Sequence, residues 1–343
     1  MLIESSRQLG RAAQLTLRRS VLVVISRRFA LAVRKKVTVI GGGMTGGAIA
    51  QRVVEKGIAD VVIQDDPQFA QTLHHGKALD MAQSASWLGF ETKITATDGW
   101  ADTAGSDVIV CTAGAPRKPG MSREDLLNGN ADIVRAKVTD AAKASPNAVI
   151  IIFANPMDAM CHVALQASGF PRERIIGQGG ALDTARYRAF LQMETGVSIR
   201  DIHAYVLGGH TDTTMVPVVS QARIGGLPLT SLLSQEKIDA IVARTMRGGA
   251  EIGELMKVSS AYYAPSAATA EMVEAILLDQ NRLIPSAVLC KGEYGINDIV
   301  CGVMCELGAG GIKRTFETPV SDDERSKIVA AADATKSLIA LLK

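Results

Sequence analysis

Polar side chains stand where several apolar runs of this sequence end, and a histidine is the most informative of them. His210 follows the apolar run at 204–208 in a Gly-Gly-His turn, a position that suits chemistry better than packing. Asp183 and Arg186 lie three residues apart in a predicted helix and so share one of its faces. On spacing alone they are a surface ion pair or part of a site. A carboxylate paired with His210 would make the ring a more basic, better oriented proton donor and acceptor. The other histidines lack such settings and are predicted to be structural: His74, His75, His162 and His203.

A second candidate site lies on the Gly- and Pro-rich loop that follows the apolar run at 107–111. Arg117 and Arg123 both belong to this loop. A guanidinium binds a carboxylate through two parallel charge-assisted hydrogen bonds, so the two arginines suit a carboxylate substrate. The alternative is that they are solvated loop charges. Asn155 follows the apolar run at 148–153, and it either contacts a substrate oxygen or caps the next helix.

A dinucleotide-binding turn is predicted near the start of the main domain. Gly41, Gly43 and Gly46 fit the pattern G-x-G-x-x-G between a predicted strand and a predicted helix. Such glycines turn the chain, admit a pyrophosphate against bare backbone and let helix and strand pack closely. Asp65 ends the next apolar run, where a ribose-binding carboxylate belongs, and this favours NAD over NADP. The alternative is that Asp65 and Asp66 form a solvated turn before a proline.

Short apolar runs separated by helical stretches must position these residues. The runs at 36–40, 60–65, 107–111 and 148–153 alternate with predicted helices, one of them at 126–144. This alternation indicates a parallel doubly wound sheet of the Rossmann class. Ligands on such a sheet bind beyond the carboxyl ends of the strands, which is where the candidate residues stand. The length of 343 residues suggests two domains.

Charge is distributed unevenly along the chain. Residues 1–36 carry nine Lys or Arg and one acid, which leaves a net charge of −6 on the remainder. A mildly acidic main domain of this kind gives no indication of nucleic-acid binding. Residues 1–35 have the composition of a mitochondrial presequence; the alternatives are a dispensable extension or a wrongly chosen upstream start codon. The apolar run at 21–25 is too short for a membrane span. We expect this extension to be poorly ordered and the protein to be cytoplasmic, or mitochondrial if the extension is a presequence.

The cysteines predict neither disulfides nor a metal site. Five cysteines form no C-x-x-C pair and mostly sit in apolar runs, which indicates reduced core thiols in an intracellular protein. Cys301 and Cys305 are too isolated from histidines to suggest zinc.

Taken together, the motifs resemble those of the lactate/malate dehydrogenase family, and specifically its malate dehydrogenases of the lactate-dehydrogenase-like type. The resemblance runs from residue 36 to the C-terminus. Its motifs are VTVIGGGMTG (37–46), GKALDM (76–81), TAGAPRKPGMSREDLL (112–127), ANPMDAM (154–160), LDTAR (182–186), GGH (208–210), SAYYAP (260–265) and GEYG (292–295).

The resemblance implies a role for each matching residue in NAD-dependent, reversible conversion of (S)-malate to oxaloacetate, a reaction of the tricarboxylic acid cycle. His210 would exchange the proton, with Asp183 orienting it. The substrate would be bound by Arg186 at its C1 carboxylate, by Arg117 at its distal carboxylate, by Arg123 at the reacting carbonyl and by Asn155. The implied NAD contacts are Gly41, Gly43, Met44, Thr45, Gly46, Asp65, Asn130 and Asn155.

The implied architecture is a nucleotide-binding domain followed by an α+β catalytic domain, assembled as a homodimer or homotetramer. We place the N-terminal extension, the NAD-binding Rossmann domain and the catalytic domain at 1–35, 36–178 and 179–343. The C-terminal helix is predicted to begin at the capping box of Ser321 and Glu324 and to end near Leu342.

Two departures from the family pattern concern the neighbourhood of the predicted catalytic residues. Thr211 stands where the family usually has Gly, in a turn one residue longer than the family's usual turn, and Ala154 replaces a commoner hydroxyl residue. A shift of about 1 Å at His210 could lower the rate on the order of a hundredfold. The alternative functions are a lactate or other 2-hydroxy acid dehydrogenase and a non-catalytic dinucleotide-binding protein.

Overall fold

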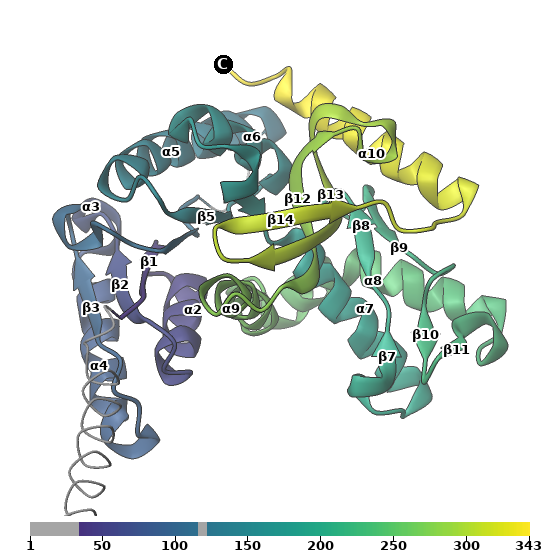
Figure 1. Ribbon diagram of the computed structural model, residues 1–343, viewed down its shortest axis with the longest axis horizontal. Helices are drawn as coiled ribbons and strands as arrows, with labels where there is room; N and C mark the ends of the chain where they lie inside the picture. The colour runs from purple at the N-terminus through teal and green to yellow at the C-terminus, as the bar shows by residue number, and fades with distance from the viewer. Residues whose placement is uncertain (1–33, 116–121) are drawn as a thin grey trace, which may run out of the picture. The chain divides into compact units, whose positions relative to one another are not determined.

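The computed structural model of the protein describes residues 34–115 and 122–343 (Figure 1). Its main sheet contains eleven strands. Six of them are parallel neighbours in the order β3-β2-β1-β4-β5-β6. They span Lys36–Ile40 (β1), Asp60–Gln64 (β2), Ile94–Thr97 (β3), Val108–Cys111 (β4), Val149–Ile152 (β5) and Ile175–Gly177 (β6). This order is that of a Rossmann sheet, so the predicted doubly wound fold is confirmed.

The central strands bury both faces, and the period of two along each strand divides the core. Val108 and Val110 face one hydrophobic cluster, while Ile109 and Cys111 between them face another. The helices of this half are α2 (Met44–Glu55), α3 (Pro67–Ala70), α4 (Leu73–Leu88), α5 (Arg123–Ala144) and α6 (Met157–Ser168). Helix α2 covers the first cluster, and α5 and α6 cover the second, on the opposite face of the sheet (Figure 1).

Local sequence explains where these helices begin and end. Ser122 accepts a hydrogen bond from the amide of Asp125, whose side chain accepts from the amide of Ser122, and this capping box starts α5. Helices α4 and α6 are capped at their C-termini by Gly89 and Gly169, both in the left-handed conformation that glycine adopts without steric penalty. Helix α5 therefore begins three residues before the predicted 126, at the first residue that its cap allows.

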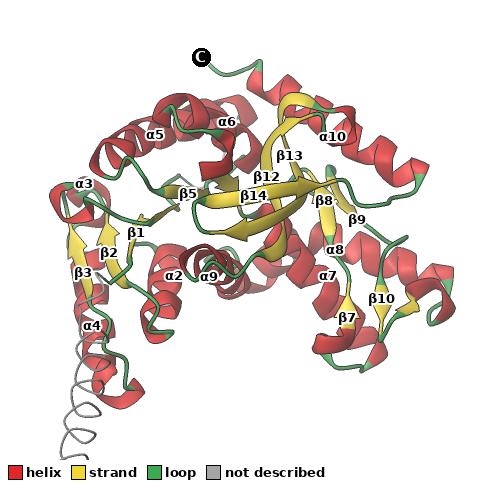
Figure 2. Ribbon diagram, viewed as in Figure 1, coloured by secondary structure: helices red, strands yellow, loops and turns green. Residues whose placement is uncertain are grey.

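An antiparallel half continues the same sheet. Strand β12 joins it to β6 through the pair Ala287 and Gly177. Its strands are β8 (Val206–Gly208), β9 (Met215–Pro217), β12 (Arg282–Lys291), β13 (Asn297–Gly308) and β14 (Gly311–Phe316), and a separate small sheet contains β7 (Ile202–His203), β10 (Arg223–Ile224) and β11 (Leu227–Pro228). Its helices are α7 (Gly179–Thr195), α8 (Gln235–Met256), α9 (Tyr263–Leu277) and α10 (Asp322–Ile339) (Figure 2). Strands and helices are thus mixed here, as predicted for the second half.

Helix α9 returns to the first half and packs along α2, where Arg52 Nε donates to Ser266 Oγ at 2.9 Å. Helix α10 has the predicted capping box of Ser321 and Glu324 but ends at Ile339, three residues before the predicted 342.

All five cysteines are free and buried, which confirms the prediction of reduced core thiols. Among the described residues, no helix combines the length and the apolarity that crossing a membrane would require. The expected disorder of the extension concerns residues outside the described ranges.

Candidate active site

His210 stands two residues after the end of β8, in a tight turn whose first two positions, Gly208 and Gly209, have no room for a side chain. Gly208 has φ +81°, and a Cβ at Gly209 would lie 2.4 Å from Thr214 Oγ1. Thr211 and Thr214 close the turn through a 2.6 Å contact between their hydroxyls. The turn that departs from the family pattern is therefore held by its own hydrogen bonds.

The imidazole of His210 is fixed by Asp183 of α7. Nδ1 lies 2.7 Å from Asp183 Oδ2, and the carboxylate is only 1% exposed. This contact assigns the proton of the neutral ring to Nδ1 and leaves Nε2 as the nitrogen that can accept a proton. Burial by itself lowers the pKa of His210, but the Asp183 carboxylate, with a smaller effect from Asp158, overcomes this and holds the pKa above its ordinary value.

Arg186 completes a buried group on α7. Its Nη1 donates to Asp183 Oδ1 at 3.0 Å, so the two oxygens of one carboxylate serve the histidine and the arginine separately. Gly248 of α8 lies against the arginine, because a Cβ there would be 3.0 Å from Arg186 Cδ. Arg186 Nε is buried and has no hydrogen-bond partner among the described residues. A donor of this kind in a buried site is well suited to an anionic ligand.

Asp158 is a neighbour of His210 that the sequence analysis missed. Its Oδ2 accepts the His210 amide at 2.9 Å, and burial raises the pKa of this carboxyl to about 6, against the hydrogen bond and the nearby histidine, which lower it. Asp158 Oδ1 has no partner in the described part of the chain. A carboxylate inside the otherwise apolar start of α6 was the available signal, since such a group is seldom buried without a role.

Asn155 lies in the loop that follows β5 and is joined to Pro156 by a cis peptide bond. Asn130 of α5 links two loops there: its Nδ2 donates to the Asn155 carbonyl at 2.6 Å, and its Oδ1 accepts the Ala115 amide at 2.8 Å. The loops after β4 and β5, which carry the predicted substrate residues, are thereby tied together. Arg117 lies outside the described residues, and Arg123 begins α5 with a side chain that the structure does not describe.

The glycine turn has the geometry that a dinucleotide requires. Gly41 has φ +101°, and a Cβ at Gly46 would lie 1.8 Å from the Gly41 carbonyl oxygen, so neither position accepts a side chain. A Cβ at Gly43 would meet nothing within 4 Å, which leaves open space at the start of α2. Met44 and Thr45 form the first turn of α2, and no side chain in the described ranges caps it. Its backbone amides can therefore bind a phosphate.

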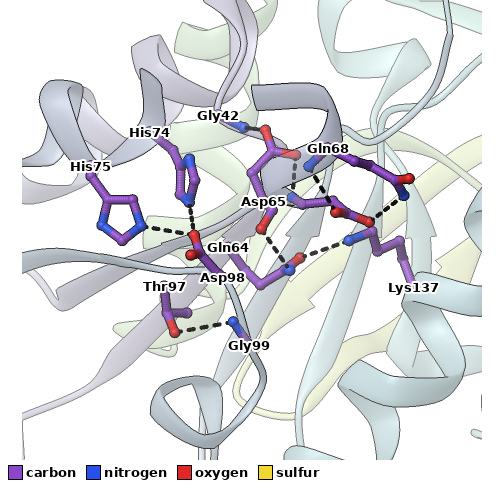
Figure 3. A network of polar contacts seen from close by, with 11 residues as sticks. Gly42, Gln64, Asp65, Gln68, His74, His75, Thr97, Asp98, Gly99 and Lys137 are labelled. Carbon is purple, nitrogen blue, oxygen red and sulfur yellow. Dashed lines mark hydrogen bonds and ion pairs between the residues drawn. The ribbon is translucent and has the colours of Figure 1, made fainter. Parts of the chain in front are cut away.

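Asp65 stands at the end of β2, beside the glycine turn (Figure 3). Its Oδ2 accepts the Gly42 amide at 2.6 Å, which holds the carboxylate against the glycine turn. Lys77 Nζ donates to the carbonyls of Gly42 and Gly43 at 2.8 and 2.6 Å and so stiffens the turn from the other side. The open glycine turn and the adjacent Asp65 carboxylate are compatible with a bound NAD.

The fold and these two groups define a dinucleotide-binding Rossmann protein whose second half holds a buried aspartate between a largely covered histidine and arginine. The chain belongs to the lactate/malate dehydrogenase family. Residues 35–177 match the family's NAD binding domain, and residues 180–342 match its alpha/beta C-terminal domain.

Curated relatives and solved structures agree with this membership. A malate dehydrogenase from Roseiflexus sp. (strain RS-1) is 51% identical over 90% of this chain and 99% of its own length. The structure of malate dehydrogenase from Salinibacter ruber is 42% identical, with a TM-score of 0.84 over 89% of this chain and 97% of that one. The lactate dehydrogenase of Cryptosporidium parvum, solved with lactic acid and nicotinamide adenine dinucleotide, is 35% identical, with a TM-score of 0.86 over 91% of this chain and 98% of that one. Fold likeness alone therefore does not separate the two substrates.

Proposed function

We propose that the protein is an NAD-dependent malate dehydrogenase, which interconverts (S)-malate and oxaloacetate. The observation that carries this proposal is the shared carboxylate of Asp183, with His210 on one oxygen and Arg186 on the other. A held proton carrier beside a cation suits a 2-hydroxy acid, because the hydroxyl and the carboxylate of such a substrate are adjacent.

His210 moves the proton through Nε2. When bound, NAD supplies or accepts the hydride. In the direction of reduction, protonated His210 donates to the oxygen that develops negative charge at C2. In the direction of oxidation, the neutral ring accepts the hydroxyl proton of malate. Asp183 stabilises the charged ring and keeps Nδ1 protonated, so that each turnover uses the same nitrogen.

Arginines bind the two carboxylates of the substrate. Arg186 holds the C1 carboxylate, which is supported by its buried, unpartnered Nε. Arg117 holds the distal carboxylate, Arg123 polarises the reacting carbonyl, and Asn155 contacts the substrate and the nicotinamide end of the cofactor. The roles of Arg117 and Arg123 rest on the sequence motif that contains them. A dry pocket cannot leave a carboxylate without such a partner at reasonable cost.

We also propose that the chain forms a homodimer or homotetramer. Large apolar side chains are exposed on α4 and at the start of α9: Trp87 is 92% exposed and Tyr263 is 64% exposed. Exposed apolar residues that gather on helices commonly mark an interface between subunits. Light scattering after size exclusion should give the mass of two or four chains, and a single chain mass would refute this assembly.

The proposed activity is tested by steady-state kinetics with NADH and NADPH, each against oxaloacetate and pyruvate. We expect NADH with oxaloacetate to give the highest kcat/KM. A preference for pyruvate would favour a lactate dehydrogenase, for which the Cryptosporidium structure is the precedent. Absence of turnover with all four combinations of cofactor and substrate would indicate a dinucleotide-binding protein without dehydrogenase activity on these acids.

The variant Arg117→Gln tests what separates the two substrates. Oxaloacetate carries a second carboxylate that pyruvate lacks, and an arginine enclosed against a methyl group is left unpaired. Discrimination by such a group can reach on the order of 10⁴. We expect the variant to lose kcat/KM for oxaloacetate by orders of magnitude and to gain it for pyruvate, with NADH affinity little changed. Arg200→Gln, at an exposed arginine, is the matched control. An unchanged ratio of the two substrates would make Arg117 a solvated loop charge.

A further inference from the structure

The start of helix α4 and the loop after β3 bring together two histidines and an aspartate that have no role in the proposed reaction. His74 and His75 lie in the first turn of α4, and Asp98 directly follows β3. Both imidazoles point at one carboxylate (Figure 3), and each Nε2 is 2.8 Å from Asp98 Oδ1. Sequence analysis predicted both histidines to be structural, because adjacent histidines and an acid 23 residues further on form no ligand motif.

We propose that His74, His75 and Asp98 form a binding site for a divalent transition-metal ion such as Zn²⁺. The two imidazole nitrogens and the carboxylate oxygen lie within 4.8 Å of one another. Imidazole with carboxylate is a donor set that Zn²⁺ binds at about 2.0–2.2 Å, so ligand atoms around a tetrahedral ion stand about 3.4 Å apart. The 2.8 Å contacts would therefore lengthen by about half an ångström around a bound ion.

The group is fixed on one side and adjustable on the other. The side chain of His74 is fully buried, and its Cβ lies against Gly42, where an added Cβ would be only 2.5 Å away. The side chains of His75 and Asp98 are 43% and 51% exposed. An ion can thus enter from solvent, rotations of the two exposed side chains can open the contacts, and water can complete the coordination.

Hydrogen bonds alone leave part of the bonding capacity of His74, His75 and Asp98 unused. Two rings share one carboxylate oxygen as acceptor, and His74 Nδ1 is buried without a partner in the described ranges. A cation between the three groups would use both Nε2 lone pairs and the carboxylate charge together. Because a metal-bound histidine is strengthened when its other nitrogen donates to an acceptor, the lack of one at His74 predicts weaker binding than at structural zinc sites.

Isothermal titration of the full-length, tag-free and metal-stripped chain with Zn²⁺ tests the site. We expect one ion to bind at this site in the wild type, and His75→Ala and Asp98→Asn each to weaken it by at least about tenfold. His162→Ala removes a half-buried histidine whose Nε2 lies 3.0 Å from Gln166 Nε2, outside this group, and the variant should bind zinc as the wild type does. His75 and Asp98 are exposed, so their replacement leaves the packing around buried His74 intact.

Two further readouts identify where an ion sits. Co²⁺ should give a visible absorption of low-symmetry nitrogen and oxygen coordination in the wild type and the His162 variant, and this should be lost in the other two. Zn²⁺ should raise the unfolding temperature of the wild type and the His162 variant only, since a ligand that binds the folded state stabilises it. Equal zinc binding by all four proteins, or no binding by the wild type, would overturn the proposal. Neither result depends on malate turnover, so the proposed activity is tested separately.

Discussion

Replacing Asp183 with Asn removes the negative charge on which His210 and Arg186 both depend. The carboxylate is 1% exposed and lies 2.7 Å from His210 Nδ1 and 3.0 Å from Arg186 Nη1. A buried ion pair that loses one partner is destabilised by about 3–5 kcal/mol, and general acid-base catalysis contributes about 10²- to 10⁴-fold to the rate. From the second of these magnitudes we expect kcat/KM for oxaloacetate reduction to fall on the order of 10³-fold. This fall corresponds to about 4 kcal/mol of transition-state stabilisation at about 1.4 kcal/mol per decade.

The pH profile separates a catalytic effect from a structural one. Asp183 raises the pKa of His210 against the effect of burial, so the Asn variant should hold its proton only at lower pH. Reduction requires the protonated ring, and the fall of kcat/KM with rising pH should therefore move to lower pH in the variant.

Stopped-flow assays across pH and NADH titration by fluorescence measure both effects. Asp333→Asn, an exposed acid on α10, is the control and should leave them unchanged. NADH affinity should also stay within about threefold in Asp183→Asn, because the glycine turn is a separate group. A variant that keeps its turnover and its pH profile would show that Asp183 serves only Arg186.

Three further changes test other residues. Asp158→Asn should remove a pH-dependent loss of stability, because the pKa of Asp158 is about 6 in the folded protein and 3.8 ordinarily, so the wild type loses stability as pH rises. In urea unfolding, the free energy of unfolding of the variant should rise by about 2 kcal/mol relative to that of the wild type between about pH 4.5 and 7.5. A difference between the two proteins that does not change with pH would contradict the burial of this carboxyl. Asp65→Asn should narrow the preference for NADH over NADPH by removing like-charge repulsion of a 2′-phosphate, as competition kinetics would measure, and an unchanged preference would exclude Asp65 as the determinant. A chain that begins at residue 34 should fold and keep its activity, since the family match begins at residue 35; an insoluble or inactive product in a circular dichroism and activity assay would show that the extension is required.

The first half of the fold followed from the sequence because its signals are local. Four-residue apolar runs such as Val108–Cys111 report strands buried on both faces, and the glycine spacing at Gly41 and Gly46 reports a backbone that must come within contact distance of itself. A helix start such as Ser122 with Asp125 is set by neighbours three residues apart. Constraints of this kind are written into adjacent residues and can be read without knowing the rest of the chain.

The partnership of His210 with Asp183 was available from the sequence only through resemblance to a family. They are 27 residues apart, with the remainder of α7 and the strands β7 and β8 between them, and no periodicity connects the two. The predicted contacts of Arg117 and Arg123 remain predictions, because their side chains lie outside what the structure describes.

The remaining features were decided by the tertiary structure. Asp158 reaches the His210 amide across 52 residues, and Asn130 joins two loops because β4 and β5 are neighbours in the sheet. Asp98 meets the start of α4 because β3 is paired with β2 at the edge of that sheet. Strand order is chosen by the burial of whole elements against one another, so a residue's neighbours across loops depend on the complete packing and not on the sequence around it.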